Sequence, residues 1–126
     1  MSGPSLWFIL AAMNRLELLR NIVELYHKHG WQLRRALLAP ADDAPANETT
    51  LTDVEIAEHE IDALWFARPS HEGREAWELR WLNATPYALF ETFEADEAEE
   101  DRADVRREME ARLREHAQGN QAETRA

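Results

Sequence analysis

Cysteine is absent from this chain of 126 residues. Its absence excludes disulfide bonds, a thiol nucleophile and a thiolate metal site. It also fits a reducing compartment, so we expect a cytoplasmic protein. Glycine is scarce, with only four residues, which excludes a glycine-rich phosphate loop. No motif for a metal or a cofactor is found, and we expect neither.

Long hydrophobic runs are missing as well. The longest, Leu6–Met13, is about half as long as a bilayer-spanning helix must be. No lysine or arginine precedes it, so it does not fit a secretory signal peptide either. We therefore expect no association with a membrane.

Positive charge is in short supply. The chain has 14 basic and 25 acidic residues, a net charge of −11, and Lys28 is its only lysine. Residues 41–126 hold nine basic and 23 acidic side chains, which gives −14, whereas residues 1–40 sum to +3. An acidic surface repels phosphate groups. We therefore expect no nucleic acid as a partner, and a basic protein as the partner that the charge favours.

A helix is predicted over Asn14–His29. Asn14 is a capping residue, Glu17 follows three positions later as in a capping box, and Gly30 suits the position that ends a helix. Apolar side chains recur at helical spacing between these signals: Leu16, Leu19, Ile22, Val23 and Tyr26.

The capping signal also bears on the start of the chain, because Met13 directly precedes it. We expect residues 1–12 to be an upstream extension that is not native; the alternative is a helical extension capped by Ser5. Residues 13–117 are expected to form a single domain with a flexible acidic loop over residues 40–50. A polar tail is expected over residues 118–126.

Three segments alternate as strands do. Ile61–Arg68 is apolar on both faces, which predicts a central strand covered on both sides. Glu75–Leu82 follows after a turn. Tyr87–Phe93 is favoured as the third strand, although Thr85-Pro86 would also open a helix. Trp31–Leu38 is predicted as a further strand, and Thr52–His59 as one short helical turn.

The strand over Glu75–Leu82 separates apolar from charged residues most clearly. Trp77 and Trp81 share one face, and we expect the first helix to pack on that face. Glu78 and Arg80 lie on the opposite face. Their plainest interpretation is a lattice of charges on the solvent side of the sheet.

The last helix is predicted over residues 97–117. It opens on six carboxylates within Glu94–Asp101, which complement the positive end of the helix dipole. Its apolar stripe is narrow and consists of Val105, Met109 and Leu113, spaced by four. We identify these three residues as candidates for binding a protein partner or a second copy of the chain.

The expected fold is therefore α+β in two layers. The N-terminal helix packs on a mainly antiparallel sheet of three to four strands, and an acidic helix follows at the C-terminus.

One polar group is a candidate catalytic site, consisting of Asp62, Glu78 and Arg80. A carboxylate on one strand and Glu-x-basic on the next can hold a divalent cation and stabilise phosphoryl charge. These residues resemble the pattern of the PD-(D/E)XK nucleases over about twenty residues. They depart from it because Arg80 stands at the lysine position and no proline precedes Asp62. The resemblance would imply a metal-dependent hydrolase.

Three functions are consistent with these features. The missing catalytic motifs favour a non-enzymatic protein-interaction or adaptor module, with a homodimer or a complex with a basic protein as its expected assemblies. The size, low isoelectric point and amphipathic C-terminal helix are similar to those of type III secretion chaperones. The third hypothesis is the hydrolase that would use Asp62, Glu78 and Arg80.

Overall fold

The computed structural model describes residues 15–40 and 54–125. The expected extension over residues 1–12, and the expected loop apart from Pro40, lie outside these residues. The helices and strands, in chain order, are α2 (Arg15–Lys28), β1 (Gln32–Leu38), β2 (Glu55–Glu58), β3 (Ala63–Pro69), the short 3₁₀ helix η2 (His71–Gly73), β4 (Glu75–Trp81), β5 (Ala88–Phe93) and α3 (Glu99–Arg125).

The five strands form one mixed sheet in the order β2-β1-β3-β4-β5. Strands β1, β3, β4 and β5 pair antiparallel, whereas β1 and β2 run parallel. The expected α+β class is confirmed, with an N-terminal helix on the sheet and a helix at the C-terminus. The sheet is slightly larger than the three to four strands expected, because residues 55–58 form β2 instead of a helical turn.

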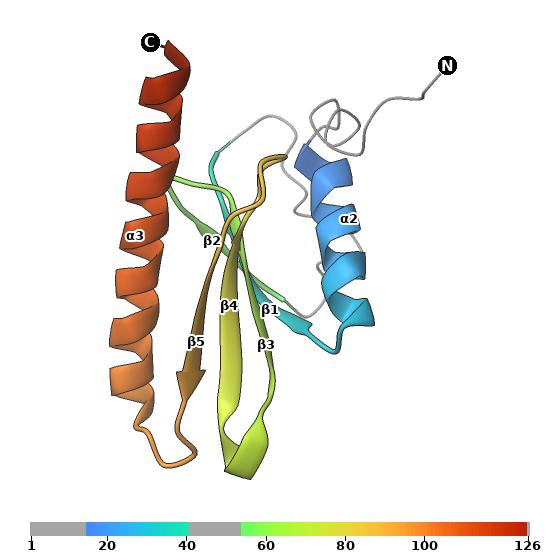
Figure 1. Ribbon diagram of the computed structural model, residues 1–126, viewed down its shortest axis with the longest axis vertical. Helices are drawn as coiled ribbons and strands as arrows, with labels where there is room; N and C mark the ends of the chain where they lie inside the picture. The colour runs from blue at the N-terminus through green and yellow to red at the C-terminus, as the bar shows by residue number, and fades with distance from the viewer. Residues whose placement is uncertain (1–14, 41–53, 126) are drawn as a thin grey trace.

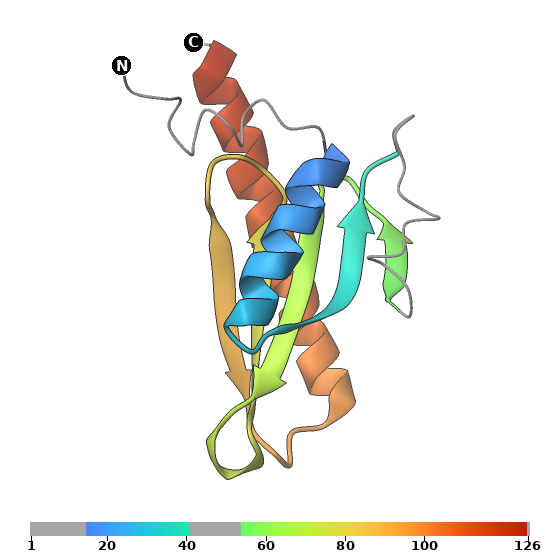
Figure 2. The ribbon, with the colours of Figure 1, turned by 90° about the vertical axis from the view of Figure 1, so that its right-hand side faces the viewer.

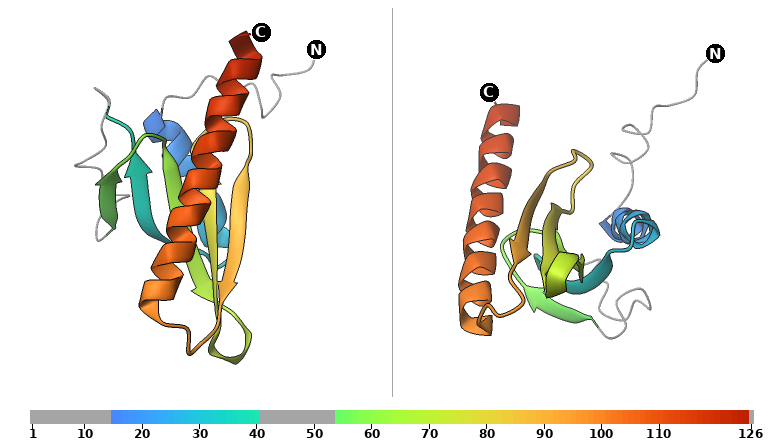
Figure 3. Two further views of the ribbon diagram at one scale, coloured as in Figure 1. Left: turned by 90° about the vertical axis from the view of Figure 1, so that its left-hand side faces the viewer. Right: turned by 60° about the horizontal axis from the view of Figure 1, so that its bottom comes forward.

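The two helices cover opposite faces of the sheet (Figure 1). Figure 2 looks onto the face that α2 covers, and the left view of Figure 3 looks onto the face that α3 crosses. Each face and its helix enclose a separate core. Among the helices of residues 15–40 and 54–125, none is both long and apolar enough to cross a membrane.

Helix α2 ends in the way that its glycine predicts. Gly30 has a φ of 85°, a left-handed conformation that glycine adopts without a steric penalty. The N–H of Trp31 donates to the carbonyl of Tyr26 at 3.0 Å, and the N–H of Gly30 donates to that of His27 at 3.1 Å. These two bonds form a Schellman motif, and the edge-on contact of Trp31 with Tyr26 completes it.

The core under α2 is built on the sheet face that carries Leu64 and Phe66, which are both fully buried. Tyr26 stacks on Phe66 with ring centroids 4.1 Å apart. The expectation that α2 packs on the tryptophan face was wrong. Alternation shows which residues share a face, but both faces of β3 are apolar, so the pattern does not say which helix covers which face.

The tryptophan face packs against α3 instead. Trp65 and Trp81 are buried there, and Trp77 is partly buried. The indole N–H of Trp65 donates to Oε2 of Glu110 in α3 at 2.8 Å, so its one polar group is satisfied. Helix α3 continues through residues 118–125, the segment expected to be a polar tail.

Strand β1 contains a β-bulge. Leu33 pairs with Phe66 and Arg35 pairs with Trp65, so Arg34 has no partner on β3. The extra residue places Leu33 and Arg35 on opposite faces, although two residues of the same parity lie on one face in a regular strand. Leu33 therefore packs against the core under α2, whereas Leu37, which has the same parity in the sequence, lies in the core under α3.

Candidate functional site

The three candidate catalytic residues lie on the sheet face that α2 covers, and each has a structural partner. Asp62 precedes β3, and its Oδ1 accepts hydrogen bonds from the backbone N–H of Ala39 at 2.8 Å and from Nη1 of Arg15 at 3.0 Å. These bonds fix the start of α2 and the end of β1 to the entrance of β3. The carboxylate is already used by the fold.

Glu78 and Arg80 are covered by α2 and do not lie on a solvent face. Glu78 accepts the hydrogen bond that the hydroxyl of Tyr26 donates. Arg80 is only 9% exposed; its guanidinium donates to the backbone carbonyls of Trp81 and, at 3.5 Å, Asn83. The interpretation as an exposed charge lattice is therefore wrong, because α2 covers the face of the sheet that carries Glu78 and Arg80.

Burial changes the acidity of two of these groups. Burial, followed by the hydrogen bond to Glu78 and its charge, raises the pKa of Tyr26 above its ordinary value. Burial lowers the pKa of Arg80, although Tyr26 and Glu78 oppose this effect. Tyr26 therefore keeps its proton next to the carboxylate of Glu78, and the hydrogen bond between the two side chains holds α2 to the sheet.

The fold separates the two carboxylates of the proposed metal site. The backbone carbonyl of Asp62 accepts from the N–H of Leu82, whereas Glu78 pairs with Phe66. Four residues along a strand separate the two positions, which corresponds to about 13 Å. Within the described ranges, no group of three His, Asp or Glu residues is placed to hold a metal ion. The geometry therefore gives no support to a shared cation.

The apolar stripe of α3 packs within the chain. Met109 and Leu113 are 2% and 0% exposed in the core on the tryptophan face, and Val105 packs against this core from its edge. The expectation that these residues bind a partner is corrected by their burial.

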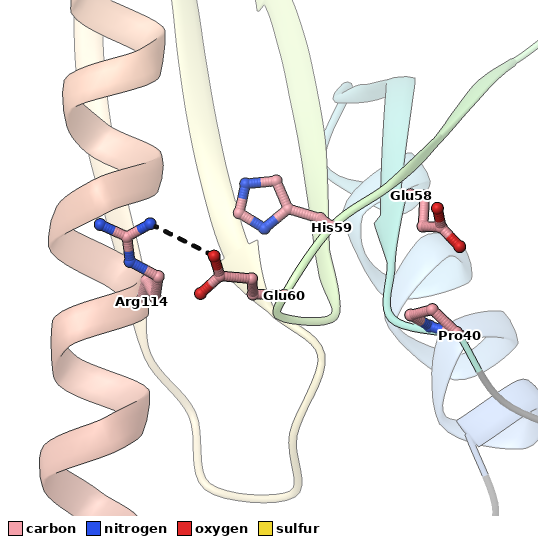
Figure 4. A pocket seen from close by; sticks show the side chains of 5 residues that line it. All are labelled: Pro40, Glu58, His59, Glu60 and Arg114. Carbon is pink, nitrogen blue, oxygen red and sulfur yellow. Dashed lines mark ion pairs between the residues drawn. The ribbon is translucent and has the colours of Figure 1, made fainter.

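An open cavity of about 470 Å³ lies where the β2–β3 connection meets α3 (Figure 4). Glu60 points toward Arg114, with 3.7 Å between Oε1 and Nη1. His59 accepts from the N–H of Ile61 through Nδ1, and its Nε2 lies 3.7 Å from Oε1 of Glu110. These contacts join α3 to the sheet, so the polar groups of this cavity serve the fold.

A second cavity opens between α2 and β4, beside the edge strand β5. Its volume is about 180 Å³, and its lining residues are Leu25, Tyr26, His29, Trp31 and Glu78. We call it the α2–β5 groove. Phe90 of β5 approaches Trp31, one of these lining residues, edge-on with ring centroids 6.3 Å apart, and so lies beside the groove.

Two large apolar side chains are exposed to solvent here, one in the lining of the groove and one beside it. Leu25 is 54% exposed and Phe90 is 57% exposed. The sequence does not single out either residue as exposed, because Leu25 continues the apolar stripe of its helix and Phe90 lies in a largely apolar strand. The signal was present in the width of that stripe, which is greater than one sheet face can cover.

Strand β5 is also an edge of the sheet. It pairs with β4 on one side, and no strand of the described residues pairs with its other side. An edge strand presents backbone N–H and C=O groups that can pair with another chain.

No protein-family model, curated protein or solved structure matches this chain, so the function of this site is inferred from its geometry alone.

Proposed function

We propose that the protein is a non-enzymatic protein-interaction module that binds an extended segment of a partner along β5. The observation that carries the proposal is the exposure of Leu25 and Phe90, each more than half exposed, beside an unpaired edge strand. Isolated exposed apolar residues are common, but Leu25 lines the groove and Phe90 contacts Trp31 of its lining, so the two flank one apolar surface, which is the kind that partners bind.

The mode of binding follows from strand geometry. A segment added to β5 would pair its backbone with the free edge, and its side chains would alternate between the two faces of the sheet. On the face that α2 covers, those side chains would lie beside Phe90 and at the mouth of the groove. The aromatic wall formed by Phe90 and Trp31 would then supply apolar contact, and the edge would supply hydrogen bonds.

The charge around β5 favours a basic segment. The six carboxylates of Glu94–Asp101 directly follow the strand, and the whole chain has a net charge of −11. A segment with lysine or arginine side chains would gain electrostatic attraction and faster association. A second copy of this chain carries the same negative charge, which opposes a homodimer through this edge.

The experiment uses a photo-reactive cross-linking amino acid at position 90, with position 56 on the opposite edge strand as the control. Ile56 is 40% exposed, which makes it a matched apolar surface position. We expect cross-links from position 90 to one extended basic segment of a partner, identified by mass spectrometry, and no such cross-links from position 56.

Two substitutions complete the test. Phe90→Ser should abolish the complex, whereas Ile56→Ser should leave it intact. Cross-links from position 90 to a second copy of the chain, together with a dimeric mass in solution, would contradict the proposal in favour of self-association. A secretion-type chaperone is the special case in which the partner is a single exported protein. The separation of Asp62 from Glu78 argues against the hydrolase.

A further inference from the structure

The face of the sheet opposite to the α2–β5 groove contains a third cavity, in which three arginines converge. Its volume is about 210 Å³, and its lining residues are Arg34, Arg35, Glu55, Trp65, Trp77 and Arg106. We call it the arginine cavity. The arginines come from β1 and α3, far apart in the sequence, so the cluster is a product of the fold.

The β-bulge makes this cluster. Arg35 pairs with Trp65 and Arg34 is the extra residue before it, so two consecutive side chains of β1 line the same cavity. In a regular strand, consecutive side chains point to opposite faces. Bulges re-aim side chains in this way and are frequent next to binding sites.

Trp77 orients two of the guanidinium groups. The Cζ atom of Arg106 lies 4.8 Å from the ring centroid of Trp77, and that of Arg34 lies 5.7 Å from it. Contact with an aromatic face attracts a guanidinium and removes part of its water. Two guanidinium groups are thereby held near one ring. An anion bound to both would reduce the repulsion between their positive charges.

The cavity has an excess of positive charge. Its lining residues include three arginines and one carboxylate, which leaves a net charge of +2. Glu55 pairs with Arg35 at 3.5 Å and is itself 67% exposed. Glu99 contacts Arg106 from outside the cavity, and Glu110 accepts from Trp65 behind it. Among the described residues, no carboxylate forms an ion pair with Arg34.

One donor in the cluster is unsatisfied. The Nε atom of Arg35 is buried and has no hydrogen-bond partner. Buried N–H groups nearly always have a partner, and the Arg35 side chain is 39% exposed, so an acceptor from the solvent side, a water or an anion, can reach this donor. An anion with several oxygens would satisfy it and would bridge the neighbouring guanidinium groups as well.

We propose that the arginine cavity binds a phosphoryl group. A phosphate monoester carries close to two negative charges at neutral pH, and the three guanidinium groups of the cavity outnumber the two carboxylates that pair with them, Glu55 and Glu99. Guanidinium groups bind phosphate oxygens in pairs of hydrogen bonds. The cavity is smaller than the roughly 300–1,000 Å³ of sites for drug-sized ligands, so it recognises a phosphoryl head group with at most a small ring beside Trp77.

The test is a titration of the full chain with inorganic phosphate, pyrophosphate and phenyl phosphate, at an ionic strength held constant with sodium chloride. The indole N–H signals of Trp65 and Trp77 in nuclear magnetic resonance spectra report on the cavity, and Trp77→Phe assigns them. We expect saturable shifts of these two signals. Tighter binding of phenyl phosphate identifies an organic monoester as the ligand, and tighter binding of pyrophosphate identifies a polyphosphate.

Matched variants separate the site from the charge of the surface. Arg34→Gln and Arg106→Gln should each weaken binding by at least about tenfold, since each removes hydrogen bonds between charged groups. Arg107→Gln changes the net charge equally, on the same helix, but its side chain is 69% exposed and pairs with Asp104. It should change the affinity by less than about twofold, because exposed charges are screened.

The proposal would be overturned by shifts that do not saturate, or by equal losses of affinity in Arg106→Gln and Arg107→Gln. Arg106→Lys guards against a folding defect, since it keeps the charge but loses the planar donor fork. It should melt as the wild type does and still bind phosphate more weakly. Wild-type affinity in Arg106→Lys would also count against the assignment.

Discussion

Tyr26 in α2 donates its hydroxyl hydrogen to Glu78 in β4, a residue 52 positions further along the chain. The tyrosine ring also stacks on Phe66 of the neighbouring strand. One side chain therefore joins the helix to two strands, through an apolar face and a polar tip. The same tyrosine lines the α2–β5 groove, so the stability of the helix and the shape of the groove depend on it together.

Tyr26→Phe keeps the stacked ring and removes only this hydrogen bond. We expect it to lower the free energy of unfolding by about 1.5–3 kcal/mol, the range for hydrogen bonds to charged groups. Urea denaturation measures the change. Tyr87→Phe is the control, because the hydroxyl of Tyr87 has no hydrogen-bond partner among the described residues while its ring stacks on His116. Equal losses in both variants would rule out a special role for the bond to Glu78.

The same bond predicts a dependence on alkaline pH. The pKa of Tyr26 is raised in the folded protein, whereas an unfolded tyrosine titrates near 10. The stabilising contribution is therefore complete below about pH 10 and declines as the pH rises toward the folded value. We expect Tyr26 to form its phenolate only when the protein unfolds. The difference in ultraviolet absorbance between the wild type and Tyr26→Phe follows the ionisation of Tyr26 alone. A Tyr26 phenolate that forms near pH 10 in the folded protein would contradict the prediction.

Trp81 and Trp77 share one face of β4 but differ in burial. Trp81 is 6% exposed, whereas Trp77 is partly buried at the arginine cavity. Trp81→Ala should destabilise the protein by about 3–5 kcal/mol, as expected for a large side chain removed from a core. Trp77→Ala should cost less, because part of its surface is already in contact with water. Denaturation of both variants under one condition compares them, and a greater loss at Trp77 would be inconsistent with this packing.

Much of this fold could be predicted from the sequence. The apolar spacing of α2, the glycine that ends it and the alternation of β3, β4 and β5 are local signals, and they were sufficient for those elements. Strand β2 could not be predicted, because its four residues gain their structure from pairing with β1. The faces of the sheet were assigned to the wrong helix, since alternation records a shared side and gives no information on what covers it.

The site was less accessible to sequence reasoning than the fold. Asp62 and Glu78 share a face, but their separation depends on the register between β3 and β4, which no local pattern encodes. Arg80 was read as exposed because arginine usually is. The arginine cavity depends on the bulge at Arg34. Because this extra residue has no partner on β3, alternation along the sequence of β1 assigns the residues beyond it to the wrong face.

Asp62→Asn distinguishes the structural role of this carboxylate from the metal-binding role. The change removes the charge that Arg15 contacts at 3.0 Å but keeps an oxygen for the N–H of Ala39. We expect a loss of stability of about 1–3 kcal/mol, from a cation left with a poorer partner. Glu58→Gln on the exposed strand β2 should be neutral. A rise in the melting temperature of the wild type with Mg²⁺ or Mn²⁺, absent in Asp62→Asn, would restore the metal hypothesis.

Phe90→Ser tests whether the surface beside the groove can lose its exposed aromatic side chain without loss of the fold. Phe90 is 57% exposed and contacts Trp31 only edge-on. We expect the melting transition to move little, with a change in free energy within about 0.5 kcal/mol. Thermal unfolding followed by circular dichroism is sufficient to show it. A large destabilisation would make Phe90 part of the core and would remove the basis for the binding surface.

The bulge at Arg34 has a consequence for the gene as well. Leu33 already lies opposite Phe66 and Arg35 opposite Trp65, so the ladder is in register on both sides of the extra residue. Deleting the Arg34 codon would make β1 regular and leave every other pair unchanged. The β1–β3 pairs therefore do not require Arg34, whereas the arginine cavity does, because the extra residue is what gives it a second consecutive arginine from β1.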